Sequence, residues 1–131
     1  MAGEREVEFL EIEDLVDLTI RLLGDASPIR DFGLLGSGAA RPETTVFGKD
    51  AYPDLWTKAA ALLQSIVKSH PLVDGNKRLG WVATAVFLEI NGVAASTAPN
   101  GDVYLLVTDV AAGNKSVEDI ALWLRRLANG H

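Results

Sequence analysis

The sequence contains no cysteine, which excludes disulfide bonds, thiolate metal sites and a cysteine nucleophile and fits a reducing cytoplasm. Basic residues are also scarce: 12 Lys and Arg stand against 18 Asp and Glu, and the net charge of −6 argues against a nucleic-acid binder. The longest uncharged apolar stretch, Leu79 to Leu88, is far shorter than the roughly 20 residues of a membrane span. The acidic start, Met1 to Glu6, does not resemble a basic leader peptide. These absences predict a small, acidic, cytoplasmic domain that binds neither membrane nor nucleic acid directly.

The composition is that of a folded protein, because 48% of the 131 residues are hydrophobic and 23% are charged. The chain has no internal repeat or low-complexity tract, so we expect a single domain over residues 1–131. Hydrophobic residues recur at helical spacing along most of it. We therefore predict an all-α fold, a compact helical bundle. Gly24 should cap the first helix and Ser116 the last one. Pro71 should end the preceding helix, because proline disfavours helical geometry at the residue before it, His70. The predicted helices cover about 12–23, 54–69, 75–91, 102–112 and the residues after 116.

Residues 25–53 lack this period and are rich in Gly, Pro, Ser and Thr. We expect one short helical turn there and a brief extended piece at residues 44–47, before Gly48. The glycine cluster from Gly33 to Gly38 has no strand before it, which favours a loop over a dinucleotide-binding turn. The three tryptophans stand at helical spacing or at helix starts and are predicted core residues.

The segment His70-Pro-Leu-Val-Asp-Gly-Asn-Lys-Arg78 joins two of the predicted helices. Where the second helix opens, its first backbone N–H groups have no partner within the helix and form a natural anion site at the positive end of the helix dipole. Lys77 and Arg78 add two cations, and Gly75 removes a side chain that would keep a ligand from the backbone. The pattern predicts a phosphate site without a Gly-x-x-x-x-Gly-Lys-[Ser/Thr] loop, which the sequence lacks.

Two further residues of the segment turn an anion site into a candidate reaction centre. Asp74 is a hard oxygen ligand of the kind that holds Mg²⁺ against substrate phosphates. His70 has a side chain that can accept a proton at cellular pH. A base, a magnesium ligand and phosphate-binding cations are the parts that phosphoryl or nucleotidyl transfer needs.

Simpler interpretations of the same residues stay open at this point. Asp74 is also a good N-cap for the following helix. Lys77 and Arg78 are equally compatible with a solvated charged turn, and a lone His70 near a helix end with a surface or capping role. The tripeptide of Gly113 to Lys115 repeats Gly-Asn-Lys without an upstream His or a following Arg, and we interpret it as a turn.

Residues 70–78 resemble the signature of the Fic/Doc superfamily, and in particular its Doc (death-on-curing) branch. The Fic pattern reads His-Pro-Phe-x-x-Gly-Asn-Gly-Arg with a second Arg soon after, and the Doc pattern reads His-x-Phe-x-[Asp/Asn]-[Ala/Gly]-Asn-Lys-Arg. Lys77 stands where Fic enzymes have glycine, which is the Doc feature. The resemblance extends over most of the chain and implies a helical Fic fold with a short flap segment.

The resemblance also implies a function. Doc proteins are the toxin half of toxin–antitoxin pairs and act as protein kinases that phosphorylate a threonine of elongation factor Tu, which arrests translation. Carried over to this sequence, His70 is the general base and Asp74 holds Mg²⁺ between the phosphates of ATP. The expected partners are this translation factor and an antitoxin whose disordered tail folds over the site. The phosphates would be clamped by Gly75, Asn76, Lys77 and Arg78, and the flap that aligns the target hydroxyl would lie at Thr45, Val46 and Phe47.

Two positions depart from the family patterns. Leu72 replaces the Phe that anchors the motif in the core, but it is apolar and should still pack. Trp81 stands where Fic enzymes have their second Arg, which weakens the alternative of a Fic-type protein AMP-transferase. A lysine in place of the motif glycine should reverse ATP, so that its γ-phosphate faces the hydroxyl. A catalytically silent protein-binding module of the same fold remains as a third hypothesis.

Overall fold

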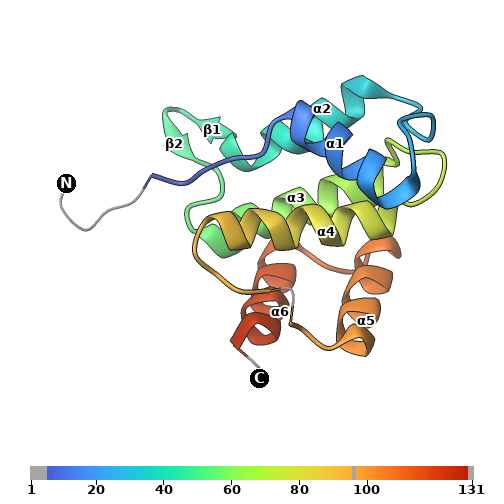
Figure 1. Cartoon of the computed structure of the whole chain (residues 1–131). Coiled ribbons are helices and arrows are strands. Elements are labelled where there is room, and N and C mark those ends of the chain that lie inside the picture. The colour runs from blue at the N-terminus through green and yellow to red at the C-terminus, as the bar shows by residue number, and fades with distance from the viewer. Residues whose placement is uncertain (1–5, 96, 130–131) are drawn as a thin grey trace.

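A computed structural model describes residues 6–95 and 97–129 (Figure 1). The described part is mostly helical, with a short 3₁₀ helix, η1 (Arg41–Glu43), and one two-stranded hairpin, β1 (Thr45–Val46) paired antiparallel with β2 (Lys49–Asp50). The predicted all-α fold with a short extended segment is confirmed. Its six α-helices are α1 (Ile12–Leu23), α2 (Phe32–Ala40), α3 (Leu55–Ser69), α4 (Asn76–Ile90), α5 (Asn100–Ala111) and α6 (Val117–Asn129).

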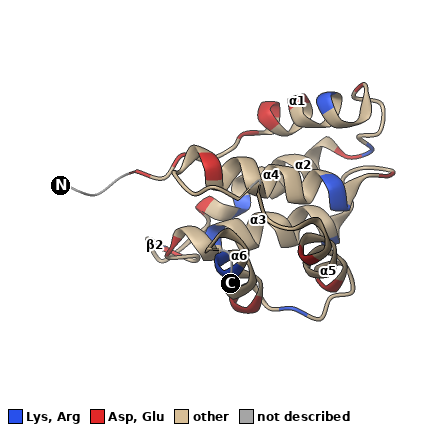
Figure 2. Ribbon diagram, turned by 60° about the horizontal axis from the view of Figure 1, so that its bottom comes forward, with Lys and Arg blue, Asp and Glu red and all other residues tan. Residues whose placement is uncertain are grey.

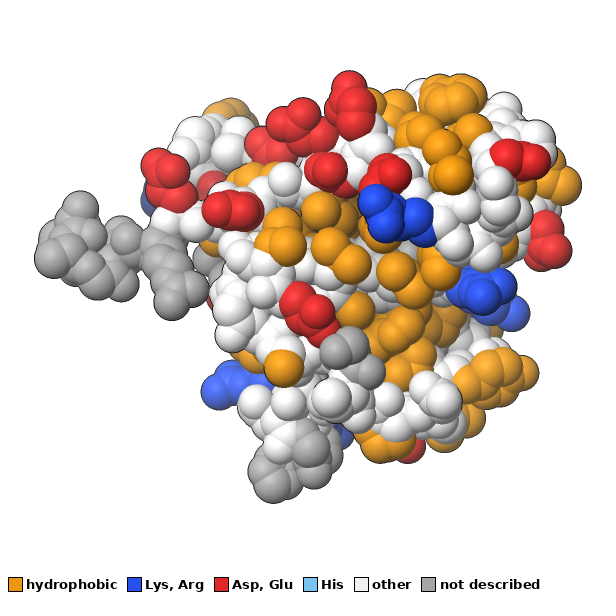
Figure 3. Space-filling view, viewed as in Figure 1, with side chains coloured by type: hydrophobic (Ala, Val, Ile, Leu, Met, Phe, Trp, Pro, Cys, Tyr) orange, Lys and Arg blue, Asp and Glu red, His pale blue; other side chains and the backbone are white. Residues whose placement is uncertain are grey.

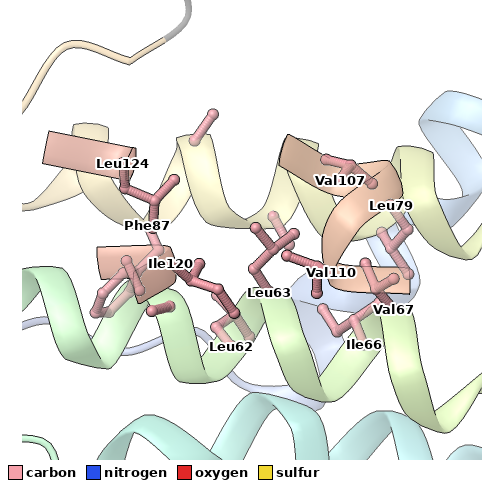
Figure 4. Close-up of a cluster of buried hydrophobic side chains, with 14 of the residues drawn as sticks. Leu62, Leu63, Ile66, Val67, Leu79, Phe87, Val107, Val110, Ile120 and Leu124 are labelled. Carbon is pink, nitrogen blue, oxygen red and sulfur yellow. The ribbon is translucent and has the colours of Figure 1, made fainter. Parts of the chain in front are cut away.

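Helix α3 lies at the centre of the bundle, in contact with α2, η1, α4, α5 and α6. Figure 4 shows the core that it shares with the helices around it, where side chains of α3 meet those of α4, α5 and α6. Helix α4 crosses α3 closely because Gly80 has no side chain: a Cβ there would lie 2.7 Å from Val67 Cγ2. The motif segment between these two helices is thus held by the most tightly packed pair in the fold. The largest fully buried side chains include Leu62, Leu63, Ile66, Leu79, Phe87, Leu106, Ile120 and Leu124.

The glycine cluster that we expected to form a loop is part of helix α2, so that prediction is wrong. Asp31 caps the helix, since its side chain accepts a hydrogen bond from the Leu34 N–H at 2.9 Å. Glycine also has a use here, because a Cβ on Gly38 would lie 3.3 Å from Ile66 Cγ1 of α3. Close packing against α3 outweighs the low helix propensity of glycine, which local pattern could not reveal.

Most predicted helix ends agree with the structure. Gly24 follows α1 with φ +98°, and the Ser116 hydroxyl accepts a hydrogen bond from the Asp119 N–H at 3.1 Å. Helix α5 begins at Asn100, two residues before the expected start. The helical period of residues 75–91 predicts an inward Ile90, but this side chain is 43% exposed at the last position of α4. The tryptophans pack on the core but are only half-buried, since an indole can reach the core while one edge stays in water.

Charges are unevenly distributed on the helices. Figure 2 shows charges of both signs on α1 and α6 and acidic residues on α5, whereas the first turn of α4 carries Lys77 and Arg78. No helix in residues 6–95 and 97–129 is long and apolar enough to cross a membrane. The first turn of α4 therefore carries two positive charges and no acidic residue, on a protein whose net charge is −6.

Candidate active site

The end of α3 presents His70 to solvent. Pro71 disfavours helical geometry at the residue before it, and His70 accordingly takes the left-handed conformation with φ 56° and ψ 60°. A non-glycine residue in this region costs of the order of 1–2 kcal/mol, so the surrounding contacts must hold it there. The prediction that Pro71 ends the helix is confirmed, and the turn leaves the imidazole exposed at the start of the motif loop.

A neighbouring loop fastens the motif loop by an isolated antiparallel bridge. The Arg30 N–H donates to the Pro71 carbonyl at 2.9 Å, and the Val73 N–H donates to the Pro28 carbonyl at 2.8 Å. Between these bonds, the Leu72 side chain is buried, with 1% of its surface exposed. Leu72 therefore anchors the loop in the core as expected, although the family pattern has Phe there.

The side chain of Asn76 fastens the loop from the other side. Its Oδ1 accepts a hydrogen bond from the Leu72 N–H at 2.8 Å, and its Nδ2 donates to the Leu72 carbonyl at 2.9 Å. Nδ2 also lies 3.4 Å from Nδ1 of His70, a long contact that orients the ring without fixing its tautomer. The resemblance assigned phosphate binding to Asn76. In the structure its carboxamide is occupied by the loop, which leaves its backbone N–H to face a ligand.

Helix α4 opens without a side-chain cap. Its N-cap is Gly75, whose φ of +95° suits glycine, and a Cβ there would lie 2.9 Å from Leu23 Cδ1. The alternative that Asp74 caps the helix is wrong: its Oδ1 accepts from the adjacent Gly75 N–H at 2.9 Å instead. The first three N–H groups of α4 have no acceptor among the described residues, so they can bind an anion.

One cavity of about 390 Å³ collects all the residues predicted from the motif. The charged side chains of Asp74, Lys77 and Arg78 are exposed at this cavity, and none forms an ion pair with any residue in the described ranges. The two cations are thus available to a polyanionic ligand. The cavity is lined by Val67, His70, Val73, Asp74, Gly75, Asn76, Lys77, Arg78 and Ala111.

A magnesium ion would have one protein carboxylate at this site. Asp74 uses Oδ1 for the Gly75 N–H, and its Oδ2 has no hydrogen-bond partner within residues 6–95 and 97–129. No cluster of three or more His, Asp or Glu suited to a metal occurs among those residues. A single carboxylate fits Mg²⁺, which keeps several waters and binds through one or two carboxylates together with substrate phosphates.

The predicted flap residues stand apart from the cavity. Thr45 and Val46 form β1, and Phe47, fully exposed with φ 52°, stands in the turn of the hairpin. The hairpin precedes α3 and the motif loop follows it, and Figures 1 and 2 place them at opposite ends of that helix. A helix of 15 residues spans about 22 Å. The role of Thr45, Val46 and Phe47 in aligning a hydroxyl stays a prediction, and it requires a target large enough to reach both places.

A buried lysine that sequence reasoning missed holds the hairpin against α3. Lys58 is 3% exposed, and its Nζ donates to Asp50 Oδ2 at 3.0 Å and to the Tyr52 carbonyl. The Tyr52 hydroxyl in turn accepts from Arg41 Nε at 3.0 Å. The sequence does contain a signal of this burial: Lys58 stands three residues after Leu55 and four before Leu62, at the edge of the apolar face of the helix.

The sequence profile of the Fic/DOC family matches residues 8–88, which contain the central helix and the whole motif. The chain belongs to the Fic/Doc family, the class of protein that the helical fold and the motif loop define.

A particular relative is also known. The chain is 44% identical, over 122 residues, to Toxin Doc of Mycolicibacterium smegmatis. The alignment covers 92% of this chain and 94% of that protein, so the two proteins correspond over nearly their whole lengths.

Proposed function

We propose that this protein is a toxin of the Doc type, a protein kinase that transfers the γ-phosphate of ATP to a Ser or Thr hydroxyl of a translation factor. Elongation factor Tu is the expected target, and arrest of translation the expected result. The observation that carries the proposal is the cavity at the α3–α4 junction, where a potential base, a carboxylate and two cations meet uncapped helical N–H groups. The similarity to a toxin supports the biological setting.

His70 is the general base of the proposed reaction. It accepts the proton of the target hydroxyl, whose oxygen attacks the γ-phosphorus, while the bond from that phosphorus to the bridging β–γ oxygen breaks and ADP leaves. The imidazole is exposed at the cavity and oriented by Asn76, so a hydroxyl from another protein can reach it. Chemistry of this kind depends mainly on positioning and on neutralising charge.

The start of α4 is the proposed phosphate-binding element. Its free N–H groups and the positive end of the helix dipole face the cavity that Lys77 and Arg78 line. Asp74 would hold Mg²⁺, which neutralises part of the charge on the phosphates. The Lys77 side chain occupies the place that a glycine would leave open, which favours the orientation of ATP with its γ-phosphate toward the hydroxyl.

Labelled ATP separates this chemistry from transfer of AMP. The protein is incubated with cell lysate or purified elongation factor Tu and with ATP labelled at either the γ- or the α-phosphate. We expect label on protein only from the γ position, and none with His70→Ala. Asp74→Asn should lose most of the magnesium-dependent turnover and keep the melting temperature of the wild type. Label only from the α position would refute the kinase in favour of an AMP-transferase.

Expression in cells tests the toxin. Wild type should arrest growth, His70→Ala should not, and co-expression of a cognate antitoxin should restore growth. Equal arrest by both forms would mean that the protein acts as a catalytically silent binding module. The expected antitoxin carries a tail that is disordered alone and folds on the toxin.

A further inference from the structure

Two exposed cations lie near His70 and take no part in the proposed binding of phosphate. Arg30 stands in the loop before α2 and Lys68 in the last turn of α3, and neither lines the motif cavity. Figure 3 shows a group of basic side chains at the edge of the molecule where α4 begins. Neither Arg30 nor Lys68 forms an ion pair with any residue in the described ranges. Both positive charges are therefore available to a partner.

The antiparallel bridge between Ile29 and Leu72 determines on which face Arg30 lies. Side chains alternate between the two faces of an extended segment, and Ile29 and Leu72 both point into the core, with 8% and 1% of their surfaces exposed. The neighbouring Arg30 and Val73 accordingly lie on the outer face, and both are exposed. Packing of the bridge against the core thus holds Arg30 at the surface, next to the motif loop.

The guanidinium of Arg30 reaches the end of α3. Its Nη2 lies 3.5 Å from the carbonyl oxygen of Ser69, which belongs to the same peptide unit as the His70 N–H. A positive charge is favourable there, because the carbonyl end of a helix carries partial negative charge. This long contact uses one N–H, and the other N–H groups of the guanidinium have no partner within residues 6–95 and 97–129. Arg30 is thus held beside His70 with most of its donors free.

Lys68 reaches the rim of the motif cavity on the side of α5. Its Nζ lies 3.6 Å from the point where a Cβ on Gly113 would stand, just after the end of that helix. Ala111, two residues earlier, lines the cavity together with His70. Lys68 therefore lies between α3 and the end of α5, whereas Arg30 comes from the loop before α2. The two cations approach the end of α3 from different neighbours, and His70 follows that end directly.

The acidic side chains of the loop before α2 do not neutralise these charges. Asp25 accepts hydrogen bonds from Ser27, and Asp31 accepts one from the Leu34 N–H. Neither carboxylate forms an ion pair with a cation in the described part of the chain. A protein that brings a hydroxyl to the proposed base therefore meets positive charge around it. The chemistry that fits this charge is a carboxylate on the protein that carries the hydroxyl.

We propose that Arg30 and Lys68 bind an acidic side chain of the target protein, next to the hydroxyl that is phosphorylated. The inference rests on the proposed function, because it requires that hydroxyl to lie at His70. A guanidinium can hold a carboxylate through two parallel N–H bonds, and the ammonium of Lys68 adds a second positive charge. Exposed charges of this kind act mainly on association with the partner and are weakened by salt. The two residues select among hydroxyl-bearing surfaces, and neither touches ATP.

Steady-state kinetics with γ-labelled ATP tests this surface. The acceptor is the purified protein that wild type phosphorylates, which is expected to be elongation factor Tu. Arg30→Gln and Lys68→Gln should each raise the KM for this acceptor at least threefold and leave kcat and the KM for ATP within twofold of wild type. Arg30→Lys keeps the charge and should recover most of the lost affinity. The matched control is Arg125→Gln, an exposed arginine on α6, which should behave as wild type does.

The melting temperature of each variant is measured to confirm that it folds. A merely structural role of Arg30 would lower this temperature or kcat, whereas a role in binding the acceptor changes its KM alone. The KM of wild type for the acceptor should also rise with salt concentration, and that of the Arg30→Gln, Lys68→Gln double variant should rise less.

A double-mutant cycle with the acceptor provides the second test. After mass spectrometry has identified the phosphorylated hydroxyl, the acidic residue nearest to it in the acceptor is replaced by its amide. This change should raise the KM at least threefold for wild type and have no further effect with the double variant. The proposal is overturned if folded Arg30→Gln and Lys68→Gln both keep the KM of wild type, or if the amide has equal effects on wild type and the double variant. Wild type that phosphorylates no protein would refute the proposed function itself, and this proposal with it.

Discussion

Replacing Asn76 with alanine should destabilise the motif loop, because two hydrogen bonds to the backbone of Leu72 are lost together. Each neutral bond contributes about 0.5–1.5 kcal/mol net, and a buried group left without a partner costs about 1–3 kcal/mol. Leu72 is 1% exposed, so water cannot easily replace the amide. Alanine regains up to about 0.7 kcal/mol in helix propensity. We expect the free energy of unfolding to fall by about 2–3 kcal/mol.

Thermal denaturation followed by circular dichroism measures this loss. With an unfolding entropy of about 2.1 cal/mol/K per residue, a chain of 131 residues loses about 3–4 °C of Tm per kcal/mol. Asn76→Ala should therefore melt about 7–11 °C below wild type. Asn76→Asp keeps the acceptor for the Leu72 N–H and loses the donor to its carbonyl, so its Tm should fall between the two. An Asn76→Ala protein that melts within about 2 °C of wild type would refute the structural role assigned to this side chain.

Three other perturbations follow from the geometry of the loops. Gly75→Ala should lower the free energy of unfolding by about 1–3 kcal/mol, because φ is +95° there, and an unchanged urea midpoint would contradict this. Lys58→Met should lower the free energy of unfolding by only about 1 kcal/mol, since its partner Asp50 is more than half exposed. It should also speed proteolytic cleavage of the hairpin, because Lys58 holds the hairpin against α3. A cleavage rate equal to that of wild type would contradict this role of Lys58. Hydrogen bonds from the side chain and then the backbone of Ser27 hold the pKa of Asp25 below its ordinary value. The stabilisation by these hydrogen bonds is thus present above the unfolded pKa of Asp25 and is lost as pH falls through the lower folded pKa. Ser27→Ala should raise the pKa of Asp25 measured by NMR titration. Identical titration curves for the two proteins would show that the Ser27 side chain does not lower this pKa.

The helices that hold the motif could be predicted because their signals are local. Apolar residues at helical spacing define α3 and α4, and Pro71 and Gly24 mark ends that depend on the backbone of one or two residues. The motif could be found for the same reason, since its residues are adjacent in the chain. A single cavity collects them because one turn of helix and a six-residue loop keep them close.

Other features depend on partners that are distant in the chain. Helix α2 was missed because its glycines are poor helix formers whose value appears only in packing against α3. The burial of Lys58 depends on the hairpin, which folds back on the first turn of α3. The position of that hairpin, at the opposite end of α3 from the motif, is likewise a matter of tertiary arrangement.

The sequence by itself determined the helical class of the fold, the limits of its central helices and the identity of the residues at the α3–α4 junction, since each follows from the period of apolar residues or from a contiguous motif. Only the tertiary structure decided that Asn76 fastens the motif loop and that the Arg30 side chain reaches the end of α3 beside His70. Local patterns specify which backbone conformations are favourable. Contacts between residues far apart in the chain specify which side chains are left free to meet a ligand.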